Sequence, residues 1–309
     1  MKMPYFQRIA SAARGAAWLV RPSGLRSQLA ELTRQDGLAR DHQLSETARL
    51  ERENQELRAQ IARLQDRDRR IREFDAGDLR SFERRVSSQN GEDGIIEEIF
   101  RRIGTTNKFF VEIGAETGEE CNCRRLVREA GWNGVFVEAD PAKHARLTEV
   151  YRDYPEVVCV QAFVRSDQIA QLLADRGVPP DLDLLSIDID GNDYWVWKAI
   201  TNRPRVVVIE YNADYRVPRR WVMQENPGHA WDGTNYYGAS LASLASLGRE
   251  KGYTLVCTDS TGVNAFFIRD DLYTTDKFLD PIVHYYYLPL NNRHCPQGHP
   301  PRNGPCVEI

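Results

Sequence analysis

The sequence predicts an α/β fold in which a mostly parallel, doubly wound sheet is covered by helices on both faces. Between residues 109 and 210, five short apolar runs alternate with stretches of helical periodicity. Two further apolar runs close the pattern, and the seven residues between them leave no room for a helix. Alternation of this kind predicts a parallel sheet, and the short last connection predicts an antiparallel hairpin at its edge.

The predicted elements follow directly from these periodicities. Strands are expected at 109–113, 135–138, 157–160, 184–187, 206–210, 254–257 and 265–268. Helices are expected at 95–103, 119–130, 141–151, 166–176, 194–201 and 238–251. The sequence thus predicts a seven-stranded domain over about 80–290.

A segment rich in Leu, Arg, Glu and Gln precedes this domain at 27–74. Apolar residues recur there every seven positions, at Leu50, Leu57, Leu64 and Ile71, with Ile61 four after Leu57 and a polar Asn54 one heptad before Ile61. Such heptads are typical of a coiled coil, in which a polar core position fixes the register. We expect a coiled coil, most simply a homodimer; a lone helix folded against its own domain is the alternative.

Residues 1–26 carry five basic side chains and no acid, interleaved with Phe6, Ile9 and Trp18. This pattern suits an amphipathic segment that makes peripheral contact with an anionic membrane, and it equally suits a solvated chain end. No apolar run approaches the ~20 residues that span a bilayer. The sequence leaves both interpretations open.

Charge and cysteine content narrow the protein class. The formal net charge is −4. The chain therefore has no excess of basic residues, and its charge gives no indication of a nucleic-acid partner. Six sparse cysteines do not form a disulfide framework and favour a reducing, cytoplasmic location. The Pro- and Gly-rich tail at 291–309 is expected to be flexible. It contains four residues of the types that coordinate zinc, but without the usual paired spacing: His294, Cys295, His299 and Cys306.

The first predicted strand runs into a glycine-containing turn, with Glu112 in the strand and Gly114 and Gly118 after it. Glycine lets the backbone turn sharply and approach a ligand, and the helix that follows offers free N–H donors. The spacing is Gly-x-x-x-Gly, which disfavours a dinucleotide pyrophosphate. The motif predicts a nucleotide-type site at the carboxyl edge of the sheet.

The second predicted strand ends at Glu138, 24 residues after Gly114. A carboxylate at this position is placed to accept hydrogen bonds from ribose hydroxyls. The alternative is a charge that only caps the helix beginning at Pro141.

The fourth and fifth predicted strands end in a group of oxygen ligands. Asp188 and Asp190 follow one strand, and Glu210 and Asn212 end the next. We expect Asp188 or Asp190 to act as a catalytic general base, or Asp188, Glu210 and Asn212 to bind a hard cation such as Mg²⁺. The plainer alternative is that Asp190 and Asp193 only build a turn and cap a helix.

These motifs and the strand order resemble those of the class I S-adenosylmethionine (SAM)-dependent methyltransferases with their Rossmann-like fold, most closely the FkbM-type branch. The resemblance covers about 85–272. It implies that SAM binds along Glu112, Gly114, Ala115, Gly118, Glu138 and Asp188, with Gly114 and Gly118 flanking its methionine end and Glu138 holding its ribose. It implies O-methylation of a sugar, glycan or small hydroxylated metabolite. The paired carboxylates also resemble those of metal-assisted, catechol-type O-methyltransferases.

Several aromatic residues after the strand ends are expected to wall an acceptor pocket, which loops and insertions commonly shape. They are Tyr194, Trp195, Tyr211, Tyr215, Trp221, Trp231, Tyr236 and Tyr237. Gln89 and Glu92, before the first strand, are secondary cofactor candidates or plain helix caps. Two other functions stay open: an NAD-type oxidoreductase, and a non-catalytic SAM-binding scaffold oligomerised by its coiled coil.

Overall fold

The computed structural model describes residues 22–281 and 299–309, and the chain divides into two units, Met1–Ile71 and Arg72–Ile309. The first unit is described from residue 22 onward, where the helix α2 (Pro22–Gly77) begins. The basic segment at 1–21 lies outside the described residues. Among the described residues, no helix is long and apolar enough to cross a membrane.

The helix α2 confirms the helical periodicity of the N-terminal region. Its apolar side chains face solvent in the single chain, with 46% of Leu50, 55% of Leu57 and 52% of Ile61 exposed. The side chains of Asn54, Leu64 and Ile71 lie outside the described part of the structure. Pairing of this helix into a coiled coil therefore stays a prediction.

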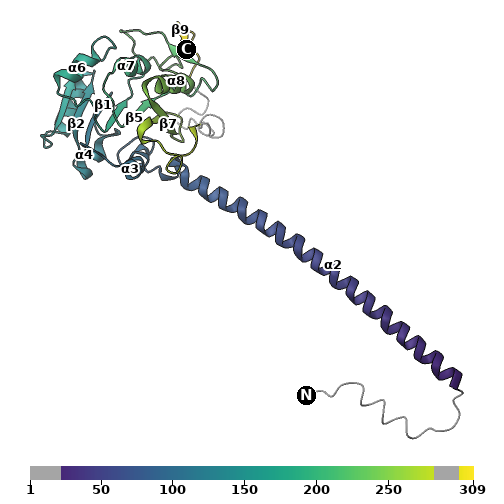
Figure 1. Cartoon of the computed structure of the whole chain (residues 1–309). Coiled ribbons are helices and arrows are strands. Elements are labelled where there is room, and N and C mark those ends of the chain that lie inside the picture. The colour runs from purple at the N-terminus through teal and green to yellow at the C-terminus, as the bar shows by residue number, and fades with distance from the viewer. Residues whose placement is uncertain (1–21, 282–298) are drawn as a thin grey trace. The chain divides into compact units, whose positions relative to one another are not determined.

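The second unit is built on a seven-stranded sheet with the order β3-β2-β1-β4-β5-β8-β7 (Figure 1). Its strands are β1 (Phe109–Ile113), β2 (Asn133–Glu138), β3 (Val157–Gln161), β4 (Leu184–Ile187), β5 (Val206–Glu210), β7 (Tyr253–Thr258) and β8 (Asn264–Arg269). The first five pair in parallel, and β8 runs antiparallel to both β5 and β7. This confirms the predicted seven strands and the closing hairpin.

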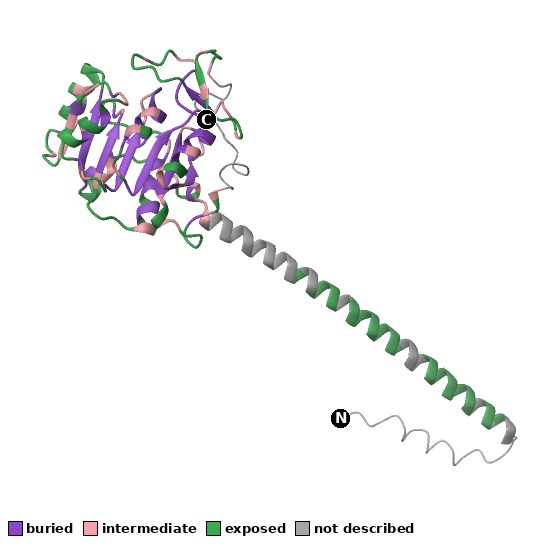
Figure 2. Cartoon of the chain, turned by 45° about the horizontal axis from the view of Figure 1, so that its top comes forward, coloured by how far each residue is buried: buried purple, intermediate pink, exposed green. Residues whose placement is uncertain are grey.

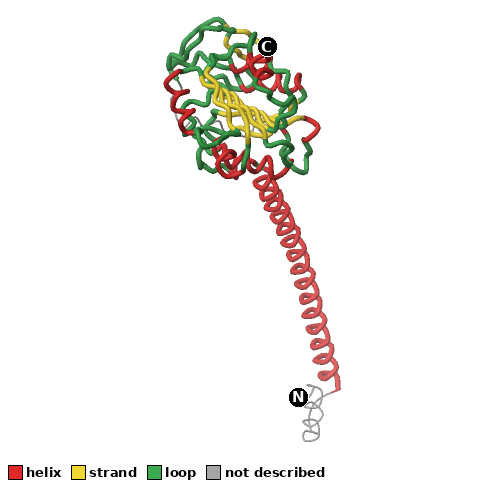
Figure 3. The backbone as a smooth tube through the Cα atoms, turned by 90° about the vertical axis from the view of Figure 1, so that its left-hand side faces the viewer, coloured by secondary structure: helices red, strands yellow, loops and turns green. Residues whose placement is uncertain are grey.

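Helices cover both faces of the sheet, because successive strand residues point to opposite sides. On one face, Val111 and Ile113 join the core that α6 (Ile169–Asp175), α7 (Asp193–Ala199) and α8 (Leu241–Lys251) cover. On the other, Phe110 packs beneath α3 (Glu92–Ile103), α4 (Arg124–Ala130) and α5 (Pro141–Val150). Figure 2 shows that the central strands of the sheet are buried, and Figure 3 shows helices on both sides of the sheet.

Two differences from the sequence-based expectation concern segments that lead to the site. The helix predicted at 119–130 begins only at Arg124, because residues 119–123 form the loop that follows the glycine turn. The tail, expected to be flexible, carries the strand β9 (Cys306–Glu308), which pairs with β6 (Trp221–Met223). Residues 282–298 lie outside the described residues, and with them His294 and Cys295 of the predicted tail ligands.

Candidate functional site

The carboxyl ends of β1, β2, β4 and β5 lie at one edge of the sheet, and two adjoining cavities open there. The first, which we call the Glu138 cavity, has a volume of about 150 Å³. The second, which we call the acidic cavity, has a volume of about 280 Å³. They share four lining residues: Gly114, Glu116, Asp188 and Asp190. A ligand that extends along this edge would therefore enter both.

The glycine turn after β1 brings two strands together. Gly114 has a φ of +87°, and a Cβ atom there would lie 1.6 Å from the carbonyl oxygen of Asp188. Glycine is thus required at this position by both its dihedral angle and the close approach of β4. The residue lines both cavities, and its role in binding a cofactor stays a prediction.

Ala115 and Gly118 are placed differently. Ala115 is fully buried. Gly118 has a φ of +71°, and a Cβ atom there would meet Leu147 Cδ1 at 2.5 Å and Tyr151 Cε2 at 2.6 Å. Neither residue is among those that line the two cavities. Gly118 therefore serves the packing of the turn against α5 rather than the floor of the cleft.

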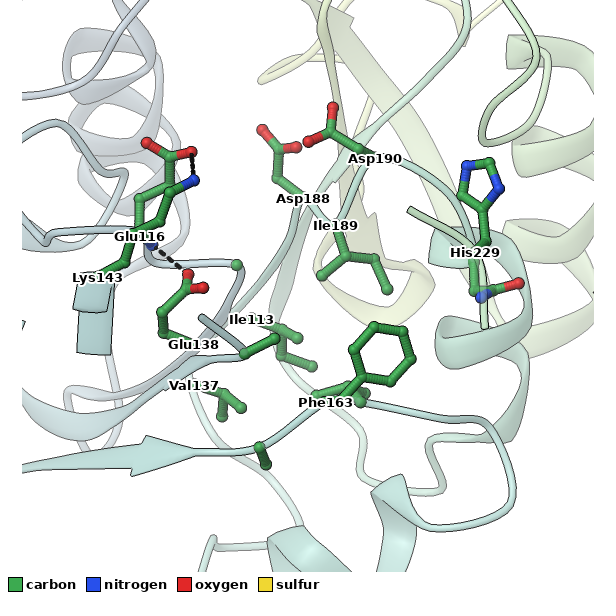
Figure 4. Close-up of a pocket in the computed structure, with 15 residues that line it drawn as sticks. Ile113, Glu116, Val137, Glu138, Lys143, Phe163, Asp188, Ile189, Asp190 and His229 are labelled. Atoms are coloured by element: carbon green, nitrogen blue, oxygen red, sulfur yellow. Dashed lines mark hydrogen bonds and ion pairs between the residues drawn. The ribbon is translucent and has the colours of Figure 1, made fainter. Parts of the chain in front are cut away.

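Glu138 lies at the end of β2 and lines the cavity that is named after it. Its carboxylate accepts hydrogen bonds from the backbone N–H of Glu116 at 2.8 Å and of Asp140 at 2.7 Å. Figure 4 shows this side chain beneath Glu116, with the first of these bonds drawn. Each carboxylate oxygen keeps a lone pair beyond these bonds, so a fixed acceptor remains for hydroxyl donors.

Glu112 fixes the loop beyond the turn. Its two carboxylate oxygens accept hydrogen bonds from the backbone N–H groups of Asn122 and Cys123, both at 2.8 Å. These donors precede α4, so the carboxylate occupies the place where an external anion would bind a helix N-terminus. Burial raises the pKa of Glu112. The side chain lines the acidic cavity, where a cationic group would favour its ionised form.

Three carboxylates converge where the two cavities meet. Asp188, Asp190 and Glu210 each offer an oxygen within 4.8 Å of the others. Glu210 is only 7% exposed, and its Oε2 has no hydrogen-bond partner among the described residues. Burial raises the pKa of Asp188 and of Glu210, and repulsion from Asp188 raises that of Glu210 further. A cation or a shared proton would relieve this repulsion.

Asn212 does not join this group, although the sequence predicts it as a metal ligand. Its Nδ2 donates to the carbonyl oxygens of Asn235 at 3.0 Å and Tyr237 at 2.9 Å. Its Oδ1 accepts from the backbone N–H of Asp214 at 3.1 Å. The fully buried side chain thus holds the segment after β5, and Asp190 takes its place beside Asp188 and Glu210.

Asp193 builds the turn after β4, as the plainer sequence interpretation has it. Its carboxylate accepts from the backbone N–H of Ile189 and of Gly191, both at 2.9 Å. Burial raises its pKa to about 6. Asp190 stays exposed in the left-handed region, with a φ of +52°. The turn therefore directs Asp190 to the cavities and Asp193 to the backbone.

The Glu138 cavity also contains residues that the sequence analysis missed. Phe163, after β3, is 50% exposed and lies with Ile189 on the apolar side of the cavity, as Figure 4 shows. Lys143 pairs with Glu116 at 2.7 Å across the cavity rim. His229 comes from the segment after β6, and burial lowers its pKa, which favours the neutral imidazole. The sequence could have indicated Phe163, because this residue follows a predicted parallel strand and therefore lies at the carboxyl edge of the sheet.

Of the eight aromatic residues expected around an acceptor, Trp231 and Tyr237 line the acidic cavity. Tyr194 and Tyr211 are buried in the core beneath the sheet, each 1% exposed. The others pack within the domain: Trp195 in that core, and Tyr215, Trp221 and Tyr236 in a small separate cluster. The secondary candidates Gln89 and Glu92 also line the acidic cavity.

No protein-family model and no curated protein sequence matches the chain. Among solved structures, it is similar to the N-terminal domain of EvdMO1 with SAH bound, at 14% identity over 59% of this chain and 81% of that one, with a TM-score of 0.39. The METTL16 MTase domain matches at 14% identity over 58% and 65%, with a TM-score of 0.37. The CurJ carbon methyltransferase matches at 10% identity over 58% and 52%, with a TM-score of 0.38. Identities this low leave the chemistry of the chain to be inferred from its own site.

Proposed function

We propose that the chain is a SAM-dependent methyltransferase whose cofactor lies along the sheet edge from Glu138 to Asp188. The observation that carries the proposal is the Glu138 carboxylate, which two backbone N–H groups hold in the same cavity as Gly114. A carboxylate at the end of the second strand accepts hydrogen bonds from the two hydroxyls of a ribose. Phe163 and Ile189 supply the apolar side that a purine needs.

The same geometry disfavours a dinucleotide. A pyrophosphate needs free N–H donors at the glycine turn. Here the N–H groups of Gly114 and Ala115 both donate to the carbonyl oxygen of Val137, at 2.9 and 3.2 Å. The N–H of Glu116 donates to Glu138. The surrounding carboxylates would repel phosphate groups, whereas they suit the sulfonium and ammonium charges of SAM.

Methyl transfer at this site is a single displacement. An acceptor oxygen forms a bond to the methyl carbon as the carbon–sulfur bond breaks, and that electron pair stays on sulfur as a neutral thioether. The hydroxyl proton passes to Asp188, whose raised pKa makes it a stronger base than an ordinary aspartate once it is ionised. Because the cofactor is already activated, alignment of the three atoms contributes most of the rate.

A divalent cation is the second way to assist this reaction, and the unpartnered Glu210 Oε2 favours it. Asp188, Asp190 and Glu210 would hold the ion through the oxygen ligands that Mg²⁺ and Mn²⁺ prefer. Such an ion would lower the pKa of a bound hydroxyl. Removal of divalent cations with a chelator, followed by return of Mg²⁺, tests the metal-assisted reaction. We expect activity to be lost in the chelator and regained with Mg²⁺. Full activity in the chelator would assign proton transfer to the carboxylates alone.

We further propose that the acceptor is a sugar, glycan or small hydroxylated metabolite, as the FkbM-type resemblance implies. The wide acidic cavity, open beside the three carboxylates, supports an acceptor of this size and polarity. We also propose that the chain forms a homodimer through α2 and that residues 1–26 make peripheral contact with an anionic membrane.

Calorimetric titration with S-adenosylhomocysteine (SAH) and with NAD tests the assignment. We expect SAH to bind and NAD not to bind. Binding of NAD alone would indicate an oxidoreductase. Binding of SAH without transfer of label from methyl-labelled SAM to any component of a cell extract would indicate a scaffold.

A further inference from the structure

Three aromatic rings form a corner of the acidic cavity, and they come from two distant parts of the chain. Trp231 and Tyr237 lie between β6 and α8, and His299 lies in the C-terminal segment. The ring of His299 lies 5.2 Å from that of Trp231 and 5.8 Å from that of Tyr237, centroid to centroid. The Trp231 and Tyr237 rings are 6.2 Å apart. We call these three residues the aromatic corner.

The rings meet at near right angles rather than in a stack. The interplanar angles are 74° for Trp231 and Tyr237, 84° for Trp231 and His299, and 82° for Tyr237 and His299. Trp231 is 42% exposed, and all three residues line the cavity. The arrangement suits a ligand that touches several ring faces at once.

The C-terminal segment is bound tightly enough to hold His299 in this place. The carbonyl oxygen of Pro300 accepts from the backbone N–H of Asn235 at 3.0 Å, and the backbone N–H of Arg302 donates to Asn235 Oδ1 at 2.8 Å. Arg302 also pairs with Asp232. Beyond it, β9 pairs with β6. The residues on the carboxyl side of His299 are thus tied to the same segment that carries Trp231.

The remaining lining of the acidic cavity is strongly negative. Seven carboxylates line it, and no lysine or arginine is among its described lining residues. Several of these carboxylates have their own partners, since Glu116 pairs with Lys143 and Glu120 with Arg85. Glu210 Oε2, only slightly exposed, has no hydrogen-bond partner among the described residues and belongs to this lining. Aromatic faces beside unneutralised carboxylates are the surroundings that an organic cation prefers.

We propose that the aromatic corner binds a protonated amine of the methyl acceptor, so that the preferred acceptor is an amino sugar or a similar ring that carries both an amine and hydroxyls. This proposal rests on the proposed methyl transfer. The amine would lie against Trp231 and His299, with a hydroxyl of the same ring directed toward Asp188. Anionic acceptors such as uronates are excluded by the carboxylates. None of the three corner residues lines the cavity that contains Glu138, so we expect their loss to leave SAH affinity unchanged.

A matched set of three sugars tests the proposal on the full-length chain. The protein is first titrated with SAH, which tests the proposed function separately. Methyl α-D-glucosaminide, methyl α-D-glucoside and methyl α-D-glucuronide are then titrated into the SAH-saturated protein. We expect the amine to bind about tenfold more tightly than the glucoside, from one good cation–π contact. The glucuronide should not bind measurably.

Two variants test whether the aromatic corner causes the preference for the amine over the glucoside. Trp231→Ala and His299→Ala should each reduce the amine-to-hydroxyl preference toward one while SAH affinity stays unchanged. Asn303→Ala, an exposed position in the same segment, is the control and should keep the wild-type preference. Equal binding of the three sugars, absence of binding by the amine, or loss of SAH affinity in the corner variants would each overturn the proposal.

Discussion

The carboxylate of Glu138 accepts a hydrogen bond from the backbone N–H of Glu116 at 2.8 Å, which ties the end of β2 to the turn after β1. This bond connects two motifs that are 22 residues apart in the sequence. It fixes the direction of the carboxylate before any ligand arrives. A fixed acceptor binds a ribose with less loss of conformational entropy than a mobile one.

We predict that Glu138→Ala weakens SAH binding by about tenfold to a hundredfold, because hydrogen bonds to a charged group contribute roughly 1.5–3 kcal/mol. Isothermal titration calorimetry measures the change. Glu149→Ala, at an exposed position of α5, is the control and should bind as the wild type does. Unchanged affinity in a folded Glu138→Ala protein would remove this residue from the cofactor site.

We predict that Asp188→Asn lowers kcat by about 10²- to 10⁴-fold, the usual contribution of a general base, while SAH affinity changes little. An amide is nearly isosteric with the carboxylate but cannot accept the proton. Labelled SAM with an accepted sugar measures the rate. Asp181→Asn, an exposed position before β4, should keep the wild-type rate. Wild-type turnover by Asp188→Asn would exclude it as the base.

The pH dependence follows from the raised pKa of Asp188. Burial stabilises the protonated form, so the carboxyl ionises only at a pH above the ordinary aspartate value of about 3.9. Since the base must be ionised, kcat should fall as pH is lowered through this raised pKa. A pH–rate profile shows the acidic limb. A flat profile down to pH of about 4, with the protein still folded, would contradict the assignment.

A comparison of Gly114 with Gly131 separates two costs of adding a Cβ atom to a glycine, steric overlap and an unfavourable dihedral angle. Gly114→Ala combines a φ of +87° with a Cβ that would lie 1.6 Å from the Asp188 carbonyl oxygen, whereas Gly131, with a φ of +63°, has nothing within 4 Å. We expect Gly114→Ala to lower the free energy of unfolding by more than about 3 kcal/mol, and Gly131→Ala by about 1 kcal/mol. Chemical denaturation compares the two. Equal losses would show that the β1–β4 approach relaxes freely.

Continuous apolar runs made most of the sheet predictable. The bounds of β1, β4 and β5 agree with the sequence-based expectation, because each is a short, mostly apolar run: Gly114 follows β1, Asp188 follows β4, and β5 ends at Glu210. The carboxyl ends of these strands then bring Asp188 and Glu210 together without further information. Helix starts were less predictable, since the N–H groups before α4 are satisfied by Glu112, ten residues earlier in the chain.

The parts that sequence reasoning missed depend on side-chain direction and on distant contacts. Gly118 and Gly114 look equivalent in the sequence, yet one packs on Tyr151 and the other lines the cavities. Asn212 has a side-chain oxygen of the kind that binds metals, but its amide nitrogen donates hydrogen bonds to the backbone carbonyl oxygens of Asn235 and Tyr237. His299 reaches the site through the contacts of its C-terminal segment with residues 232 and 235 and through the pairing of β9 with β6, strands separated by more than 80 residues. Periodicity carries no signal for such contacts.

A crystal structure of the chain with SAH tests the central claim most directly. We expect the ribose hydroxyls within about 2.7 Å of the Glu138 carboxylate. The adenine should lie beside Phe163 and Ile189, and the sulfur should point toward Asp188. SAH bound elsewhere, or bound here with the Glu138 carboxylate contacting only its own backbone donors, would contradict the account.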